Sequence, residues 1–108
     1  MSHHIVIDGP PSSGRTRQAI DLAAELQDHG CSVAFVVPNA QYLNHLFPRL
    51  AETLDMSRVA VVTQGKLRFL RGDESLIIAE DYDRWEDGPR KELWALHSDK
   101  VAAIIETS

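Results

Sequence analysis

The sequence predicts an α/β protein in which a five-stranded parallel sheet lies between two layers of helices, a three-layer sandwich. Two observations lead to this fold class. Strand-like and helix-like segments alternate along the whole chain, and the strand-like segments are continuous apolar runs rather than runs interrupted by polar residues. Continuous apolar strands are typical of parallel sheets that are buried on both faces. The length of 108 residues fits a single domain, residues 1–108.

Short-range patterns place the individual elements. Apolar, β-branched runs predict strands at residues 4–8, 32–37, 58–63, 75–79 and 101–105. Helical periodicity predicts helices at residues 15–29, 40–55 and 85–97. Gly30 is expected to end the first helix, and Pro48 to kink or split the second. A loop with a short helical turn is expected at residues 64–72.

The chain is acidic overall, with a net charge of −5, and this charge disfavours nucleic acid as a partner of the whole surface. The charges are uneven, because residues 58–72 contain four basic side chains and no acid, whereas acids dominate residues 73–99. A local basic patch can still bind phosphates. The one cysteine, Cys31, allows no intrachain disulfide, and we find no signal peptide or apolar run that would cross a bilayer. We therefore expect a soluble protein of a reducing compartment, the cytoplasm.

The turn after the first predicted strand carries the most specific pattern in the chain. It reads Gly9, four further residues, and then Gly14-Arg15-Thr16, which matches a phosphate-binding loop except that lysine is usual at position 15. Glycines let the loop curl so that successive backbone N–H groups point at one oxyanion, and the helix that follows adds its own N–H groups and dipole. The expected phosphate contacts are Gly9, Pro10, Pro11, Ser12, Ser13, Gly14, Arg15, Thr16 and Arg17. The alternative is a Gly/Ser turn that merely opens a helix.

This loop predicts ATP or GTP as the ligand, together with Mg²⁺, for which Thr16 supplies a hydroxyl. Arg15 keeps the positive charge of the usual lysine, but its planar guanidinium is larger and spreads its donors into a fork. It can still grip a phosphate, even with two hydrogen bonds. It is less suited to act as a point charge between two phosphates. We therefore expect binding to survive this replacement better than hydrolysis does.

The order of further segments resembles the first RecA-like domain of superfamily 2 helicases, the DEAD-box kind included, in a much shortened form. Residues 5–16 resemble the strand and loop of the Walker A motif, which is the specific match. The other similar segments are Val33-Ala34-Phe35-Val36-Val37-Pro38-Asn39 (motif Ia), Thr63-Gln64-Gly65-Lys66-Leu67 (Thr-Pro-Gly-Arg-Leu), residues 76–83 (the Walker B strand that ends in Asp-Glu-Ala-Asp) and residues 104–108 (Ser-Ala-Thr). The resemblance covers nearly the whole chain and implies a RecA-like P-loop NTPase core.

The resemblance also implies roles for the acidic pair Glu80-Asp81. At these positions the family has an acid that holds Mg²⁺ through water and an acid that orients the attacking water. Glu80 would then join Thr16 at the metal, and Asp81 would act on the water, with Glu80 and Asp81 as the catalytic candidates. The usual order of the two acids is inverted here, and the second RecA-like domain is missing, so hydrolysis would need a neighbouring subunit or another protein to complete the site. The alternative is a solvated acidic loop.

Other candidate residues have plainer alternatives. Lys66, Arg68 and Arg71 lie where the resembled domains touch the nucleic-acid backbone, but the acidic total charge favours a solvated basic turn. Tyr42 could contact an adenine, but a surface tyrosine is the preferred interpretation. Trp85 and Trp94 are read as core or interface residues.

Three functions remain open from the sequence. The first is a nucleotide-binding P-loop protein with weak or absent hydrolysis alone, acting with a nucleic-acid motor or with nucleic acid. The second is a RecA-like binding module, an inhibitor or adaptor, that no longer uses nucleotide. The third is a small nucleotide kinase, against which the chain offers no arginine-rich lid and little room for an acceptor. A domain this compact is also what we would expect from a viral genome.

Overall fold

The computed structural model describes residues 5–9, 14–70 and 75–107. The strands and α-helices, in chain order, are β1 (Ile5–Gly9), α1 (Arg15–Asp28), β2 (Ser32–Val37), α2 (Ala40–Thr53), β3 (Val59–Thr63), β4 (Ser75–Ala79), α3 (Asp87–His97) and β5 (Val101–Thr107). Short 3-10 helices fall at Met56–Arg58, Gln64–Phe69, Tyr82–Arg84 and Ser98–Lys100.

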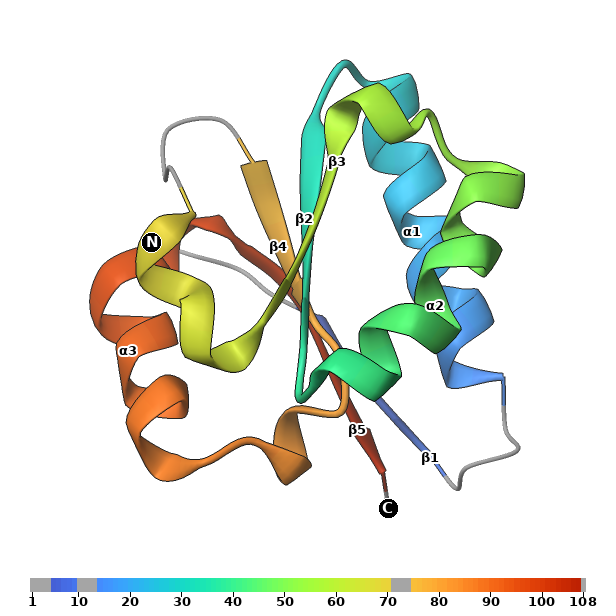
Figure 1. Ribbon diagram of the computed structural model, residues 1–108. Helices are drawn as coiled ribbons and strands as arrows, with labels where there is room; N and C mark the ends of the chain where they lie inside the picture. The colour runs from blue at the N-terminus through green and yellow to red at the C-terminus, as the bar shows by residue number, and fades with distance from the viewer. Residues whose placement is uncertain (1–4, 10–13, 71–74, 108) are drawn as a thin grey trace.

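The five strands form one parallel sheet in the order β1-β5-β4-β2-β3. Helices α1 and α2 lie on one side of this sheet and α3 lies on the other (Figure 1). This confirms the predicted α/β class with its five-stranded parallel sheet, and the arrangement is compatible with the predicted three-layer sandwich. In the sheet, β5 and β4 lie between β1 and β2. The chain therefore passes from β1 through α1 to a strand that is not its neighbour, and β4 and β5 later fill the two positions between them.

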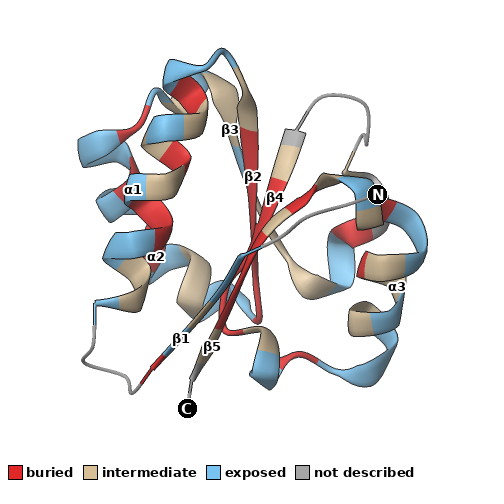
Figure 2. Ribbon diagram, turned by 180° about the vertical axis from the view of Figure 1, so that it is seen from behind, coloured by how far each residue is buried: buried red, intermediate tan, exposed pale blue. Residues whose placement is uncertain are grey.

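Each face of the sheet has its own apolar core, which explains why the strands are apolar at every position. Val33, Phe35 and Val37 belong to the cluster that packs against α1 and α2. The residues between them, Ala34 and Val36, belong to a second cluster on the side of α3. Successive strand residues point to opposite faces, so a strand covered on both sides is apolar throughout. Figure 2 shows buried residues along the central strands and on the helix faces that meet them.

The element boundaries agree with the sequence prediction to within two residues, with one qualitative exception. Pro48 does not split the second helix, because α2 continues through it from Ala40 to Thr53. Proline removes the hydrogen bond to the carbonyl four residues earlier, that of Asn44. Pro48 and Asn44 are both exposed, so water can take the place of the missing donor. Of the predicted kink or split, the split does not occur, and the reason depends on which side of the helix faces solvent.

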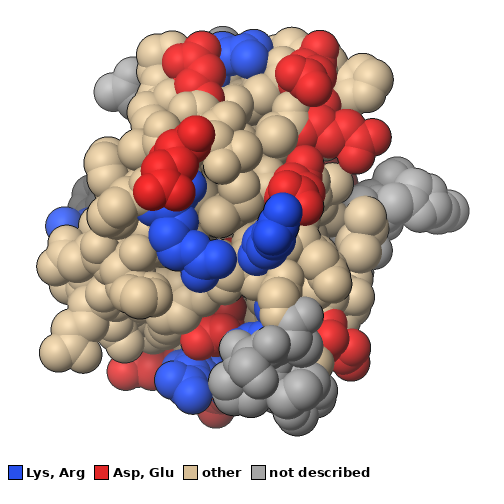
Figure 3. Space-filling model, turned by 90° about the vertical axis from the view of Figure 1, so that its right-hand side faces the viewer, with Lys and Arg blue, Asp and Glu red and all other residues tan. Residues whose placement is uncertain are grey.

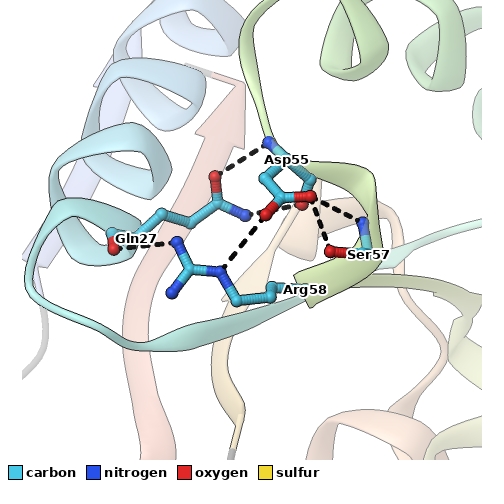
Figure 4. Close-up of polar contacts among 4 residues, drawn as sticks. All are labelled: Gln27, Asp55, Ser57 and Arg58. Carbon is cyan, nitrogen blue, oxygen red and sulfur yellow. Dashed lines mark hydrogen bonds and ion pairs between the residues drawn. The ribbon is translucent and has the colours of Figure 1, made fainter.

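A buried glutamine ties the end of α1 to the segment that leads into β3 (Figure 4). The side-chain amide of Gln27 donates to the carbonyl of Asp55 at 3.0 Å and accepts from the Asp55 N–H at 3.0 Å. Arg58 donates to the Gln27 carbonyl at 3.0 Å, and its Nε lies 3.6 Å from the Asp55 carboxylate. Ser57 donates to that carboxylate through both its N–H and its hydroxyl. Arg58, counted in the sequence as part of a basic patch, thus has a structural partner.

Replacing Gln27 with alanine is expected to lower the free energy of unfolding by about 1.5 kcal/mol, because a backbone N–H and a carbonyl lose their partner together. Urea unfolding followed by circular dichroism measures the change. Gln18→Ala is the matched control, since Gln18 is exposed on the same helix. Equal losses of stability in the two variants would contradict a structural role for the Gln27 amide.

Candidate functional site

A cavity of about 200 Å³, called the inner cavity below, lies where the first turn of α1 meets α2 and the residues after β4. Its lining residues are Arg15, Thr16, Tyr42, His45, Leu46, Arg49 and Asp81. In a parallel sheet the carboxyl ends of the strands meet at one edge, and ligands bind there. Arg15 follows β1, Tyr42 follows β2 and Asp81 follows β4, so the cavity lies at that edge.

The inner cavity brings the predicted loop and the predicted acidic pair into contact. Nη1 of Arg15 donates to Oδ1 of Asp81 at 3.3 Å, across 66 residues of sequence. Both side chains are about nine-tenths buried, with exposed fractions of 10% and 6%. Arg84 lies at the rim with its Nε 3.9 Å from Oδ2 of the same carboxylate, but its side chain is mostly exposed. The Arg15 contact is therefore the closer and the less solvated of the two.

Asp81 has an unusual backbone conformation. With φ 47° and ψ 46° it lies in the left-handed region, and it is the one non-glycine residue in the described part of the chain with a positive φ. Aspartate tolerates this region better than most residues but still at some cost in free energy. Residues held in this way cluster at functional sites, where the surrounding structure imposes the conformation. Here the left-handed turn places the Asp81 carboxylate in the cavity wall rather than in solvent.

Glu80 has a different environment from its neighbour. It is fully buried, and its Oε2 accepts a hydrogen bond of 2.7 Å from the hydroxyl of Tyr42. Its Oε1 has no hydrogen-bond partner among the described residues. Burial raises the pKa of Glu80 to about 7, against the lowering effect of the Tyr42 hydrogen bond, and the nearby charge of Asp81 raises it further. Burial also raises the pKa of Tyr42, so Tyr42 stays a donor at neutral pH.

The two acids are therefore not equivalent as metal ligands. Thr16 and Asp81 both line the inner cavity, whereas Glu80 is not among its lining residues. The Thr16 hydroxyl and the Asp81 carboxylate are oxygen ligands of the kind that Mg²⁺ takes. They fit a magnesium ion better than the predicted combination of Thr16 and Glu80, because Glu80 is buried and engaged by Tyr42. In the described part of the chain no group of three or more His, Cys, Asp and Glu side chains gathers as a metal cage.

Trp85 and Gln64 form hydrogen bonds that connect the segments at this edge of the sheet. The indole Nε1 of Trp85 donates to the Glu80 carbonyl at 2.9 Å, and Trp85 is buried as expected. Gln64, in the segment that resembles a helicase motif, donates to the Pro38 carbonyl at 2.8 Å and accepts from the Glu86 N–H at 2.7 Å. Gln64 therefore connects the ends of three loops at this edge.

Tyr42 is not the surface residue that we expected, since its hydroxyl points inward to Glu80. Tyr42, His45 and Arg49 follow one another at spacings of three and four residues, which places them on one face of α2. That spacing, directly after a strand, is the signal in the sequence that could have identified them.

The remaining predicted site residues fall in different places. Gly14 precedes α1 with a φ of 82°, a left-handed conformation that suits glycine. Arg17 lines a neighbouring hollow rather than the inner cavity. Lys66 is exposed. Four predicted phosphate contacts (Pro10, Pro11, Ser12 and Ser13) and the predicted nucleic-acid contact Arg71 lie outside the described residues, as does the side chain of Arg68.

Comparisons with known proteins identify no relative: no family model matches the chain, and no curated protein matches it. None of the helices in the described residues combines the length and the apolar character needed to cross a membrane.

Glu80→Gln is expected to remove a pH dependence of stability. The folded-state pKa of Glu80, about 7, lies above its ordinary value of 4.5, so the folded protein holds a proton that the unfolded chain releases. The contribution of Glu80 to stability is therefore lost as pH rises from about 4.5 to 7. Relative to wild type, the variant should gain about 3 kcal/mol of unfolding free energy between pH 4 and pH 8.

Urea unfolding at the two pH values measures this difference. Glu25→Gln, at an exposed position on α1, is the control and should follow wild type. A Glu80→Gln variant whose stability runs parallel to wild type across this range would show that Glu80 is ionised in the fold.

Proposed function

We propose that the protein binds a nucleoside triphosphate, ATP or GTP, through the loop of residues 9–16, and that alone it hydrolyses this ligand weakly or not at all. The observation that carries the proposal is the buried contact between Arg15 and Asp81 in the wall of the inner cavity. Two segments singled out for phosphate and metal chemistry meet there, although 66 residues separate them. A turn that merely opened a helix would give no reason for this meeting.

Phosphate binding is supported by the groups at the start of α1. Gly14 in its left-handed conformation leads into the helix, whose first N–H groups have no partner within the helix and favour an anion. Arg15 and Thr16 follow at once and both line the cavity. A guanidinium and a hydroxyl beside the N–H groups of the first helical turn form a site suited to a phosphoryl oxygen.

Weak hydrolysis is supported by the state of the two acids. Phosphoryl transfer depends on groups placed to hold the metal and to orient the attacking water. Asp81 is engaged by Arg15, and Glu80 is buried against Tyr42 and partly protonated near neutral pH. For either carboxylate to orient water, its present contact would have to break: the ion pair with Arg15 for Asp81, and the hydrogen bond from Tyr42 for Glu80. A protein partner or a second subunit that displaced these contacts would complete the site, and a nucleic-acid motor fits that role.

The same contacts also favour a second function, that of a binding module that no longer uses nucleotide. Arg15 and Asp81 already neutralise each other, and Tyr42 already occupies Glu80. A site that satisfies itself in this way fits a binding module that kept the fold and no longer uses nucleotide. The two functions differ in one measurable property, the affinity for a nucleoside triphosphate.

Titration with a fluorescent ATP analogue, with and without Mg²⁺, tests the proposal. Wild type is expected to bind with a Kd below about 1 mM. The pair Arg15→Gln/Asp81→Asn removes the guanidinium without leaving a lone buried acid, and it should bind at least about tenfold more weakly than Asp81→Asn alone. Asparagine suits position 81 because it tolerates the left-handed conformation.

The single variant Asp81→Asn serves as the reference, since it keeps Arg15, and without Mg²⁺ it should bind at least as tightly as wild type. Absence of binding by wild type at millimolar nucleotide would rule out the proposed function and leave the binding module.

A further inference from the structure

We propose that Arg49, on α2, supplies a second guanidinium that binds the terminal phosphoryl group of the nucleotide in the inner cavity. This inference rests on the proposed function and adds to it a residue outside the phosphate loop. Arg49 lies in the sequence 33 residues after the loop ends at Thr16.

The position of Arg49 is the first support. It lines the inner cavity and also a larger hollow of about 360 Å³, called the outer hollow below. The outer hollow lies between α1 and α2, and its lining residues are Arg17, Ile20, Asp21, Arg49, Glu52 and Thr53. Arg49 is the one residue common to both linings. Figure 3 faces the side of the molecule that α1 and α2 form, and there basic side chains gather around a hollow with acidic side chains beside them.

The charges of the inner cavity are the second support. Among its lining residues are two arginines and one acid. Asp81 offsets the charge of Arg15 at 3.3 Å, so Arg49 is the cation that leaves the cavity positive. An anion in the cavity therefore meets Arg49 as well as the loop.

Size and chemistry indicate what that anion is. With a volume of about 200 Å³, the inner cavity has room for a phosphoryl group and its waters. The forked guanidinium donates two parallel hydrogen bonds to such a group. The hydroxyl of Thr16 and the ring of His45 lie in the same wall and are further polar partners.

Isothermal titration calorimetry of Arg49→Gln with ATP, ADP and inorganic phosphate tests this role. Arg49 is exposed, so the variant is expected to fold. If Arg49 binds the terminal phosphoryl group, the variant should lose about tenfold or more in affinity for ATP and less than about twofold for ADP. Inorganic phosphate should compete with ATP in wild type and compete less in the variant. Arg49→Lys keeps the charge without the fork, so its affinity for ATP should lie between those of wild type and Arg49→Gln.

Lys91→Gln is the matched control, because it removes one positive charge from an exposed position on α3, on the other side of the sheet. Equal weakening by Arg49→Gln and Lys91→Gln would overturn the inference, since it would reflect only the net charge. Unchanged ATP affinity in Arg49→Gln, with wild type still binding ATP, would overturn the inference and leave the proposed function standing.

Binding of inorganic phosphate distinguishes an anion site at Arg49 from a site for a nucleotide. Wild type that binds phosphate but not ATP, with the phosphate lost in Arg49→Gln, would support an anion site at Arg49 and rule out the nucleotide. Wild type that binds neither ligand would overturn both proposals.

Discussion

An ion pair of 3.3 Å connects Arg15, in the first turn of α1, with Asp81, just after β4. The two side chains are about nine-tenths buried, and 66 residues separate them in the sequence. Two buried charges are costly to remove from water, and each depends on the other to offset that cost. The position of Arg15 against the acidic pair, and with it this wall of the inner cavity, therefore depends on the ion pair. It in turn requires β1 and β4 to end at the same edge, which the sheet order ensures with only β5 between them.

The two departures from the usual loop and acidic pattern meet in this one contact. A lysine at position 15 would offer a compact ammonium, whereas arginine offers a longer and forked donor. Asp81 is the partner of that donor. The left-handed backbone of Asp81 turns its side chain into the cavity, while Glu80 points inward to Tyr42. Arg15 and the acidic pair Glu80-Asp81 are thus parts of one arrangement.

The charged side chains at the inner cavity differ in their exposure to solvent, and this order underlies the proposal of nucleotide binding with weak hydrolysis. Arg49 lies at the exposed rim, Arg15 and Asp81 form the wall, and Glu80 lies beneath them. Groups that attract an anion are near the surface, and the acid whose pKa is raised by burial is the deepest. In the proposed function, this order would favour holding a phosphate over activating water. Trp85 reinforces the deepest layer by donating to the Glu80 carbonyl.

The sequence by itself determined the fold class, the number of strands and nearly all element boundaries. The reason is local: apolar runs, helical periodicity and glycine or proline punctuation are properties of neighbouring residues. The phosphate-loop pattern and the acidic pair were also visible locally, as candidates. Tertiary structure alone decided the order of the strands, and with it which residues meet at the carboxyl edge. Tyr42 shows the difference, because nothing near it in the sequence indicates that its hydroxyl reaches Glu80, 38 residues later. Pro48 shows the same difference, since the free-energy cost of the hydrogen bond that it removes from α2 depends on which side of the helix faces water. Contacts between distant segments, and the burial that shifts the pKa of Glu80, exist only once the sheet has brought those segments together.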